Sequence, residues 1–264
     1  MKVLVVQNKV HEKIEETLNE IKGYLNEVKE KLDFIILPEM FMMPYELKYM
    51  EKYKQSNDSE VLNFLSGLAK DNNAYLIGGS IPYTADSKIF NRSYIFDRNG
   101  KVITQYDKIH LFEVTYPNGL HFSEAKVLTR GTKPTTFDTE FGKMGVMICF
   151  DIRFPLLANK LMNDGCKCIF VPAAFNTYTG PMHWHTTFKS RAIDNQLFIV
   201  ASSPARNSFG KYEPFGHSLV CNPLGRIINE LDEKPGYFIT DIDIESIERT
   251  RAILPIVKNS VDFD

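Results

Sequence analysis

Three reactive side chains stand at the ends of short apolar runs that are typical of buried strands. Glu39 closes the stretch DFIILPE, Lys108 closes KVITQYDK, and Cys149 closes GKMGVMIC. In folds built from parallel strands and helices, reactive groups usually lie at strand ends. Taken singly, a strand-end glutamate or lysine is most often a solvated charge, and a cysteine is most often buried packing. The position that all three share favours one common site.

The segment around Cys149 predicts a strand, a thiol, a tight turn and then a helix. Pro155 suits the first position of that helix, and Gly165 suits the residue just past its end. This order resembles a nucleophile elbow, in which amides at a helix start favour the thiolate. An ammonium would favour the thiolate further, and a carboxylate could take the proton during attack. Glutamate, lysine and cysteine are the residue types that such a mechanism needs.

The rest of the chain alternates predicted strands and helices, with a hairpin turn at 98–100. This order favours layers of helix packed on sheet, with sheets packed on each other. The predicted strands are 2–7, 33–39, 74–82, 89–97, 101–106, 142–149, 166–173, 197–203, 216–228 with a turn inside it, and 236–244; the predicted helices are 12–32, 59–72, 155–164, 183–195 and 245–254.

Length and composition indicate one soluble globular domain, residues 1–264. The formal net charge of −2 offers no positive surface for nucleic acid or an anionic membrane. No stretch reaches the ~20 apolar residues of a membrane span, and the N-terminal apolar run is too short for a signal peptide. Four cysteines are too few for a disulfide framework. We therefore expect free thiols and a cytoplasmic protein.

Several longer stretches resemble those of one enzyme superfamily. LPEMF, YDKIHLF and ICFDIRFP, in this order and at these separations, are similar to the three signature segments of the nitrilase, or carbon-nitrogen hydrolase, superfamily. The resemblance continues through FSEAKVLTRG, TGPMHWHTTFKSRAIDNQ and GHSLVCNPLGRII. SPAR at 203–206 and PEMFMMPY are most similar to the omega-amidase branch, which hydrolyses the terminal amides of 2-oxoglutaramate and 2-oxosuccinamate.

The resemblance implies an α/β fold, specifically a four-layer α-β-β-α sandwich, commonly paired into a homodimer through outer helices. It implies a small-molecule amide substrate and no cofactor. Glu39 would be the general base, Cys149 the nucleophile that forms a thioester, and Lys108 a donor to the oxyanion together with the backbone N–H of Phe150. Glu124 in HFSEAK matches a second glutamate that lies beside the lysine in many members.

Further residues are candidates for binding the substrate. Arg153 could hold a substrate carboxylate with its guanidinium fork, or it could form an internal salt bridge with Asp151 or another acid. Both readings stay open. Tyr45, Phe175 and Thr177 are further pocket candidates, because their loops follow Glu39 and the strand VPAAF.

The sequence gives little support for a metal site. Cys166 and Cys168 have only one residue between them and no second pair, which is poor spacing for zinc. His183 and His185 lie two apart on a predicted helix, so they do not face each other. We expect no metal.

Two other functions stay open. One is a relative that acts on N-carbamoyl amines, deaminated glutathione or nitriles by the same chemistry. The other is a binding protein that uses this fold without catalysis, against which the presence of Glu39, Lys108 and Cys149 argues.

Overall fold

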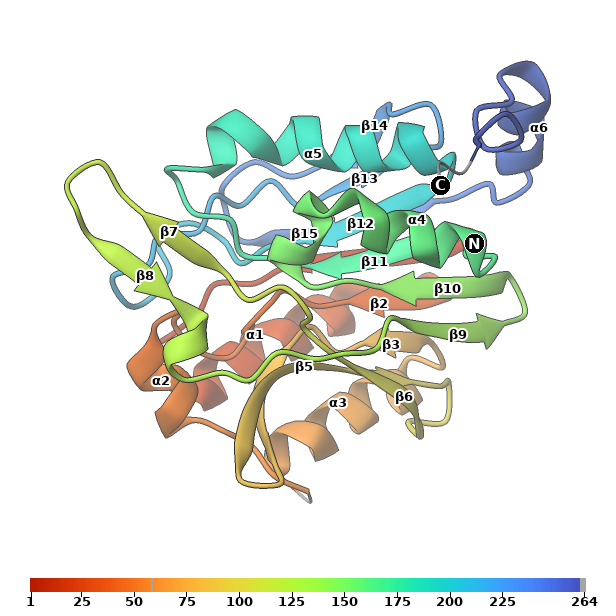
Figure 1. The fold of residues 1–264 in the computed structure, drawn as a ribbon. Coiled ribbons are helices and arrows are strands. Elements are labelled where there is room, and N and C mark those ends of the chain that lie inside the picture. Colours follow the sequence, from red (N-terminus) through yellow and green to blue (C-terminus); the bar gives the residue numbers. More distant parts are fainter. Residues whose placement is uncertain (58, 262–264) are drawn as a thin grey trace.

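Two β-sheets lie face to face in this protein, and helices cover both outer faces (Figure 1). The computed structural model describes residues 1–57 and 59–261. Its layers form the four-layer α-β-β-α sandwich that the sequence predicts. Within the described residues the helices are α1 (Ile14–Glu27), α2 (Leu47–Lys52), α3 (Glu60–Asp71), α4 (Pro155–Asn163), α5 (Gly180–Asn195) and α6 (Ser246–Ile253), with the short 3-10 helices η1 (Glu124–Lys126) and η2 (Cys149–Arg153).

The first sheet comes mainly from the N-terminal half of the chain. Its strands in the described residues are β1 (Lys2–Gln7), β2 (Phe34–Ile36), β3 (Tyr75–Ile77), β4 (Ile81–Ala85), β5 (Lys88–Phe96), β6 (Val102–Asp107) and β15 (Gly236–Asp241). Their order is β15-β1-β2-β3-β5-β4, and β6 also pairs with β5. Strands β1, β2 and β3 are parallel. Because β5 is antiparallel to β3 and to β6, strands β2 and β6 run in the same direction.

The second sheet comes from the C-terminal half. Its strands in the described residues are β9 (Thr135–Thr139), β10 (Gly142–Val146), β11 (Cys168–Pro172), β12 (Phe198–Ser202), β13 (Leu219–Cys221) and β14 (Ile227–Glu230). They follow the order β14-β13-β12-β11-β10-β9, and the central strands β10, β11 and β12 are parallel. A separate hairpin of β7 (Glu113–Thr115) and β8 (His121–Ser123) projects from the sandwich (Figure 1).

Strand β1 shows how the sequence produces the layers. Its side chains alternate between two cores, since successive residues of a strand point to opposite faces. Val3 and Val5 join the core that contains the second sheet, whereas Leu4 and Val6 join the core that contains α1 and α3. A strand buried on both faces is largely apolar, as KVLVVQ is between its first and last residues.

Two predicted element boundaries are wrong for physical reasons. The predicted helix 12–32 ends at Glu27, because Val28 is extended at φ −71° and ψ 123°. Leu32 is nevertheless buried, so its apolar character reflects packing from a loop. The predicted strand 74–82 divides into β3 and β4 around Gly79, whose φ of +60° interrupts the pleat.

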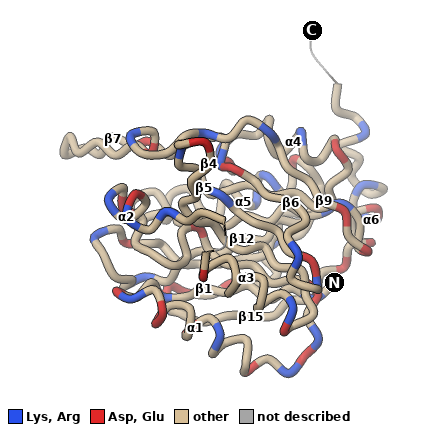
Figure 2. The backbone as a smooth tube through the Cα atoms, turned by 90° about the horizontal axis from the view of Figure 1, so that it is seen from below, with Lys and Arg blue, Asp and Glu red and all other residues tan. Residues whose placement is uncertain are grey.

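The charged residues form no surface of one sign in the view of Figure 2, where basic and acidic residues are interspersed. This distribution agrees with the small net charge of −2. In the described part of the chain, no helix combines the length and the apolar character needed to cross a membrane.

Gly79 fixes the turn that holds the loop carrying Glu39. A Cβ atom at Gly79 would lie 2.2 Å from the carbonyl oxygen of Pro38, and the positive φ adds strain. We predict that Gly79→Ala lowers the free energy of unfolding by about 2 kcal/mol or more. Urea denaturation measures this loss.

The matched control is Gly23→Ala in α1, where a Cβ meets nothing within 4 Å. This control should be neutral or should gain up to about 1 kcal/mol. Equal effects of the two substitutions would contradict the argument.

Candidate active site

Lys108 is the centre of a fully buried cluster of charges. It directly follows β6, and its ammonium lies 2.8 Å from Glu39 Oε1 and 2.9 Å from Glu124 Oε2. All three side chains are inaccessible to solvent. A buried ion costs several kcal/mol of lost hydration unless it is paired and hydrogen-bonded. The structure therefore brings together three of the residues that the sequence places in the catalytic site, and Lys108 stabilises both carboxylates.

Tyr45 and Asn91 complete the hydrogen bonds of this cluster. The Tyr45 hydroxyl donates to Glu124 Oε1 at 2.7 Å and accepts from Lys108 Nζ at 3.1 Å. Asn91 Nδ2 donates to Glu39 Oε1 at 2.9 Å. Tyr45, a candidate for substrate binding, lies beside the carboxylates and does not line the cavity at Cys149. Sequence reasoning missed Asn91, which no local signal distinguishes from its polar neighbours Arg92 and Ser93 in β5.

Ion pairing shifts the pKa values of Lys108 and Glu39 in the direction opposite to the effect of burial. Burial alone would lower the pKa of Lys108, but Glu124 and Glu39 outweigh it and hold that pKa above its ordinary value. Burial raises the pKa of Glu39, Lys108 opposes the rise, and Glu124 adds to it. A carboxylate with raised proton affinity is suited to general-base chemistry. Among the described residues, Glu39 Oε2 has no hydrogen-bond partner, so this oxygen is free to take a proton.

Cys149 lies on a strained turn shortly after β10. Its φ is +48°, in the left-handed region that residues other than glycine rarely adopt. The turn continues as η2, and α4 then begins at Pro155 and ends before Gly165, which has a φ of +93°. This confirms the predicted order of strand, thiol, turn and helix. The backbone N–H of Ala174, just after β11, donates to the sulfur at 3.4 Å.

Burial outweighs the groups that favour the thiolate form of Cys149. It is the largest cause that raises the pKa of the Cys149 thiol well above its ordinary value, and Glu39 adds to it, while Lys108 lowers it only in part. The η2 turn begins at Cys149, and α4 begins six positions later. Attack on a substrate therefore requires a base that removes the proton from the thiol.

Asp151 connects the turn at Cys149 to the strand end at Lys108. Its Oδ2 accepts from the backbone N–H of Ile148 at 3.0 Å and from the Tyr106 hydroxyl at 2.7 Å. Its Oδ1 accepts from the backbone N–H of His110 at 2.9 Å. The carboxylate is fully buried and satisfies donors on both segments. It thereby holds the nucleophile turn and the Lys108 segment together.

Arg153 is not paired with Asp151 in the structure, because the hydrogen bonds of Asp151 go elsewhere. No carboxylate lies within 4 Å of the Arg153 guanidinium in the described part of the chain. Its Nη1 lies 3.0 Å from His183 Nδ1, its guanidinium stacks 4.4 Å from the Phe175 ring centre, and its buried Nε has no partner among the described residues. Burial lowers the pKa of Arg153 below its ordinary value. Arg153 is thus a mostly buried cation that lacks an anion.

A narrow cavity with a volume of about 10 Å³ joins the thiol to this cation. Phe150 and Phe175, two of the candidates for substrate binding, lie in its wall. Thr177 is not in the wall, because its hydroxyl turns toward Glu213 at 3.3 Å. The residues that line the cavity are Phe112, Cys149, Phe150, Arg153, Ala174, Phe175, Thr179 and Tyr212.

Thr179 and Tyr212 are wall residues that sequence reasoning missed. Thr179 is two positions from the residue that was proposed, and it directly precedes α5. Tyr212 comes from a long loop after β12, and nothing in its local sequence marks it. Its ring centre lies 4.8 Å from that of Tyr45, which places it between the cavity and the buried charges.

The other histidines and cysteines behave largely as expected. His183 contacts Arg153, while His185 lies 2.6 Å from Glu230, so the two imidazoles point to different partners. The four cysteines, which include Cys166 and Cys168, are free thiols and all are buried.

We predict that Asp151→Asn destabilises the protein by about 2–3 kcal/mol, because the new amide places a donor against buried donors. Urea denaturation measures this loss. Tyr106→Phe is the matched control, since it removes one hydrogen bond and leaves the carboxylate in place, and it should cost only about 1 kcal/mol. If Asp151→Asn were as mild as Tyr106→Phe, Asp151 would not hold the two segments together.

A second prediction concerns the titration of the thiol. Glu39→Gln removes a charge that raises the pKa of Cys149 and leaves Lys108, which lowers it. The pKa should fall, so alkylation of Cys149 by iodoacetamide should reach half its maximal rate at lower pH than in the unaltered protein. Mass spectrometry of the labelled peptide gives this rate.

Glu124→Gln is the control, because Glu124 acts on Lys108 and not directly on the thiol. Its alkylation profile should move less. If the pH of half-maximal alkylation stays the same or increases in Glu39→Gln, the Glu39 carboxylate does not raise the pKa of the Cys149 thiol.

The whole chain is similar to proteins of one family. The carbon-nitrogen hydrolase family profile matches residues 2–252. Omega-amidase NIT3 of Saccharomyces cerevisiae is 42% identical over 239 residues, which cover 88% of this chain and 82% of that protein. Human omega-amidase NIT2 is 38% identical over 224 residues, which cover 85% and 81%.

A solved structure agrees with these sequence matches. The crystal structure of Saccharomyces cerevisiae Nit3, described as a member of branch 10 of the nitrilase superfamily, superposes with a TM-score of 0.87 and 36% identity. The match covers 98% of this chain and 96% of that one. Sequence, fold and the assembled glutamate, lysine and cysteine agree, and the chain belongs to the carbon-nitrogen hydrolase family.

Proposed function

We propose that this protein is a cysteine-dependent omega-amidase that hydrolyses the terminal amide of small dicarboxylate monoamides, such as 2-oxoglutaramate and 2-oxosuccinamate. The observation that carries the proposal is the cavity that presents the Cys149 thiol at one place and the Arg153 guanidinium at another. The relatives named omega-amidase support the same substrate class.

In the first half of the reaction, the Cys149 sulfur attacks the amide carbonyl carbon as its proton passes to Glu39. The oxyanion that forms is stabilised by the Lys108 ammonium and by the backbone N–H of Phe150, which act strongly in a site that excludes water. When the intermediate collapses, the C–N bond breaks and Glu39 returns the proton to the nitrogen. Ammonia leaves, and a thioester on Cys149 remains.

In the second half, Glu39 takes a proton from water, and the resulting hydroxide attacks the thioester carbonyl. The same two donors stabilise the second oxyanion. The C–S bond then breaks, the acid leaves, and Glu39 returns its proton to the sulfur. Glu39 thus alternates between base and acid, which suits a carboxylate whose pKa is raised by burial.

Glu124 supports this cycle by keeping Lys108 charged. When Glu39 is protonated, Lys108 loses one of its two anionic partners, and the ion pair at 2.9 Å with Glu124 remains. Loss of an oxyanion donor typically lowers the rate about 10²- to 10³-fold. Both glutamates are therefore needed, although they have different roles.

Arg153 gives the pocket its preference for an anion. Its guanidinium is mostly buried and unpaired with any carboxylate among the described residues, so a substrate carboxylate would supply the missing charge. The aromatic ring of Phe175 lies against the guanidinium, and the buried Nε has no partner among the described residues that would compete with a substrate carboxylate. The opposite end of the substrate then lies at Cys149.

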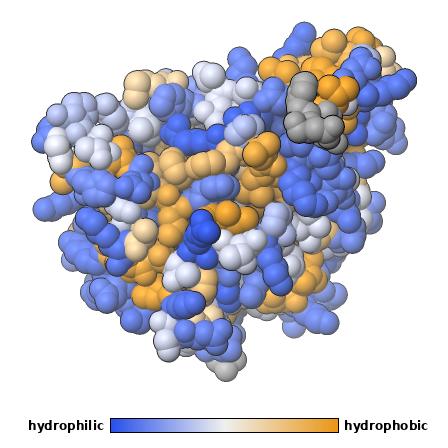
Figure 3. Space-filling model, in the orientation of Figure 1, coloured by the Kyte–Doolittle hydropathy of each residue, from blue (hydrophilic) through white to orange (hydrophobic). Residues whose placement is uncertain are grey.

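We further infer that the working form is a homodimer in the cytoplasm. Apolar side chains gather over α6 beside the C-terminal segment (Figure 3), where Ile253 is 83% exposed and Leu254 is 51% exposed. Such residues favour burial against a second copy. Free thiols suit a reducing compartment. Sedimentation of the purified protein measures the oligomeric state.

The substrate assignment predicts a preference for an anionic amide. We expect kcat/KM for 2-oxoglutaramate to exceed that for butyramide by roughly 10- to 100-fold, because a neutral amide leaves Arg153 without its partner. Release of ammonia measures both values.

The variant Cys149→Ala should release no ammonia while it keeps its fold. Equal values for the two amides would refute the substrate class but leave amidase chemistry in place. No release from any small amide, nitrile or N-carbamoyl amine would refute catalysis.

Arg153→Met tests the anion site itself. The preference for 2-oxoglutaramate should fall roughly 10-fold or more, while hydrolysis of butyramide should change less. Arg226→Met, which replaces an exposed arginine, is the matched control and should keep the preference. An unchanged preference in Arg153→Met would move the carboxylate site elsewhere.

A further inference from the structure

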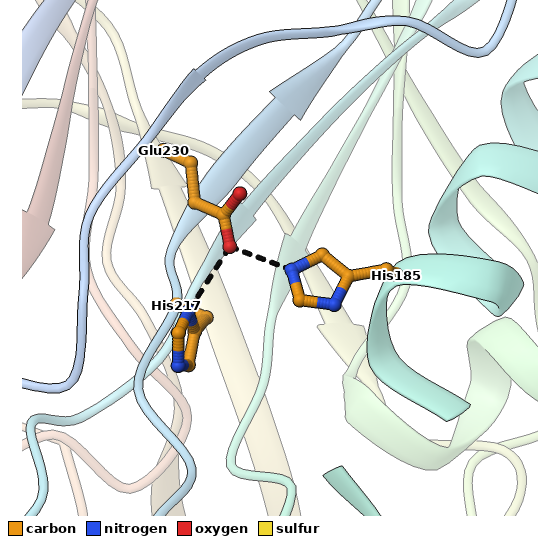
Figure 4. A group of neighbouring side chains, drawn as sticks. All are labelled: His185, His217 and Glu230. Carbon is orange, nitrogen blue, oxygen red and sulfur yellow. Dashed lines mark hydrogen bonds and ion pairs between the residues drawn. The ribbon is translucent and has the colours of Figure 1, made fainter. Parts of the chain in front are cut away.

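A second group of side chains with ligand atoms converges outside the candidate active site (Figure 4). His185 comes from α5, His217 from the loop before β13, and Glu230 from the end of β14. None of the three lines the cavity at Cys149. Sequence reasoning weighed His185 only against its neighbour His183 and missed the two partners that the fold supplies.

The distances suit a single small ion. Glu230 Oε1 lies 2.6 Å from His185 Nε2 and 3.0 Å from His217 Nδ1, and the three ligand atoms lie within 4.8 Å of one another. Around tetrahedral Zn²⁺, with bonds of about 2.0–2.1 Å, neighbouring ligand atoms stand ~3.3 Å apart. If the three ligand atoms moved slightly apart, a zinc ion would fit between them.

The surrounding structure holds the imidazole of His217 in place. The Trp184 indole N–H donates to the His217 carbonyl at 2.8 Å, and the His217 N–H donates to the carbonyl of Asp232 at 3.0 Å. The Phe215 ring stacks on the imidazole with centres 4.3 Å apart. The φ of His217 is +62°, a strained value that persists only where such contacts fix the backbone.

The side chains keep an open side toward solvent. Their exposed fractions are 38% for His185, 23% for His217 and 28% for Glu230. Two imidazoles and one carboxylate neutralise part of the charge of a divalent cation, and water can fill the remaining position. This ligand set suits late first-row metals more than Mg²⁺ or Ca²⁺, which prefer oxygen ligands alone.

We propose that His185, His217 and Glu230 bind a late first-row divalent cation, Zn²⁺ before others. The ion would join α5 to strand β14 and to the loop before β13. It would occupy the position between the carboxylate and the imidazole nitrogens, and each imidazole would carry its proton on the other ring nitrogen. We assign the ion a stabilising role, because none of the three residues lines the cavity at Cys149.

The test is a calorimetric titration of the full chain with zinc chloride. Cys149→Ala serves as the parent, because the Cys149 thiol lines a cavity and could bind zinc by itself. We expect one zinc ion per chain and a rise in melting temperature, since a ligand that binds only the folded state stabilises it. Quenching of Trp184, the only tryptophan in the chain, by Ni²⁺ gives an independent signal at the site.

His185→Ala and Glu230→Gln should each weaken zinc binding at least about 10-fold, because even second-shell changes cost that much. Glu230→Gln keeps the shape of the side chain, so its melting temperature with a chelator should match the parent. The matched controls are His121→Ala and Glu113→Gln, a histidine and a glutamate 3.6 Å apart on the β7-β8 hairpin, which should leave binding unchanged.

Two results would overturn the proposal. One is a parent protein that shows no zinc binding and no shift in melting temperature, which would mean that Glu230 only accepts hydrogen bonds from the two imidazoles. The other is zinc binding that survives His185→Ala and Glu230→Gln undiminished, which would place the ion elsewhere.

Discussion

The ammonium of Lys108, enclosed by the carboxylates of Glu39 and Glu124, is the interaction on which the candidate site depends. The three groups are fully buried, and each lies within hydrogen-bonding distance of an opposite charge. Removal of one partner would leave an uncompensated buried charge, which typically costs 3–5 kcal/mol or more. The cluster also ties the loop after β2 and the start of η1 to the end of β6. Stability and reactivity therefore rest on the same contacts.

Strained turns place the reactive groups against this cluster. Met40, next to Glu39, has a φ of +49°, and Cys149 has a φ of +48°. Such conformations cost about 1–3 kcal/mol each and persist where the surrounding structure fixes them. Here the strands that lead into both turns are buried on both faces, and the turns carry hydrogen bonds to Ser80 and Asp151. The rigid sandwich thus keeps the thiol and the carboxylate in geometries that a free loop would not hold.

The site divides into a satisfied part and an unsatisfied part. Tyr45 and Asn91 add hydrogen bonds around the glutamates and Lys108, and the ion pairs of Lys108 hold this part together. In contrast, Arg153 has only a histidine and an aromatic ring as neighbours for its charge. Satisfied charges suit a preorganised reaction centre, and a buried cation without an anion suits recognition of a charged ligand.

The sequence by itself determined the elements and the reactive residue types. The alternation of Val3 to Val6, the apolar spacing of the helices and the strand-end positions of Glu39, Lys108 and Cys149 are local patterns, and the resemblance of three segments identified the family. The same local reasoning misplaced the end of α1, because Leu32 continues the apolar spacing although it is buried from a loop.

Only the tertiary structure decided which side chains meet and what charge they carry. Asn91, Thr179 and Tyr212 reach the site from distant elements, and no local pattern marks them. The raised pKa of the Cys149 thiol also follows from burial and from Glu39, two causes that depend on the packing of both sheets. The identity of a side chain is a property of one position, whereas proximity and desolvation are properties of the folded chain. Proximity and desolvation set the pKa values, the partners of Arg153 and the convergence of His185 with Glu230.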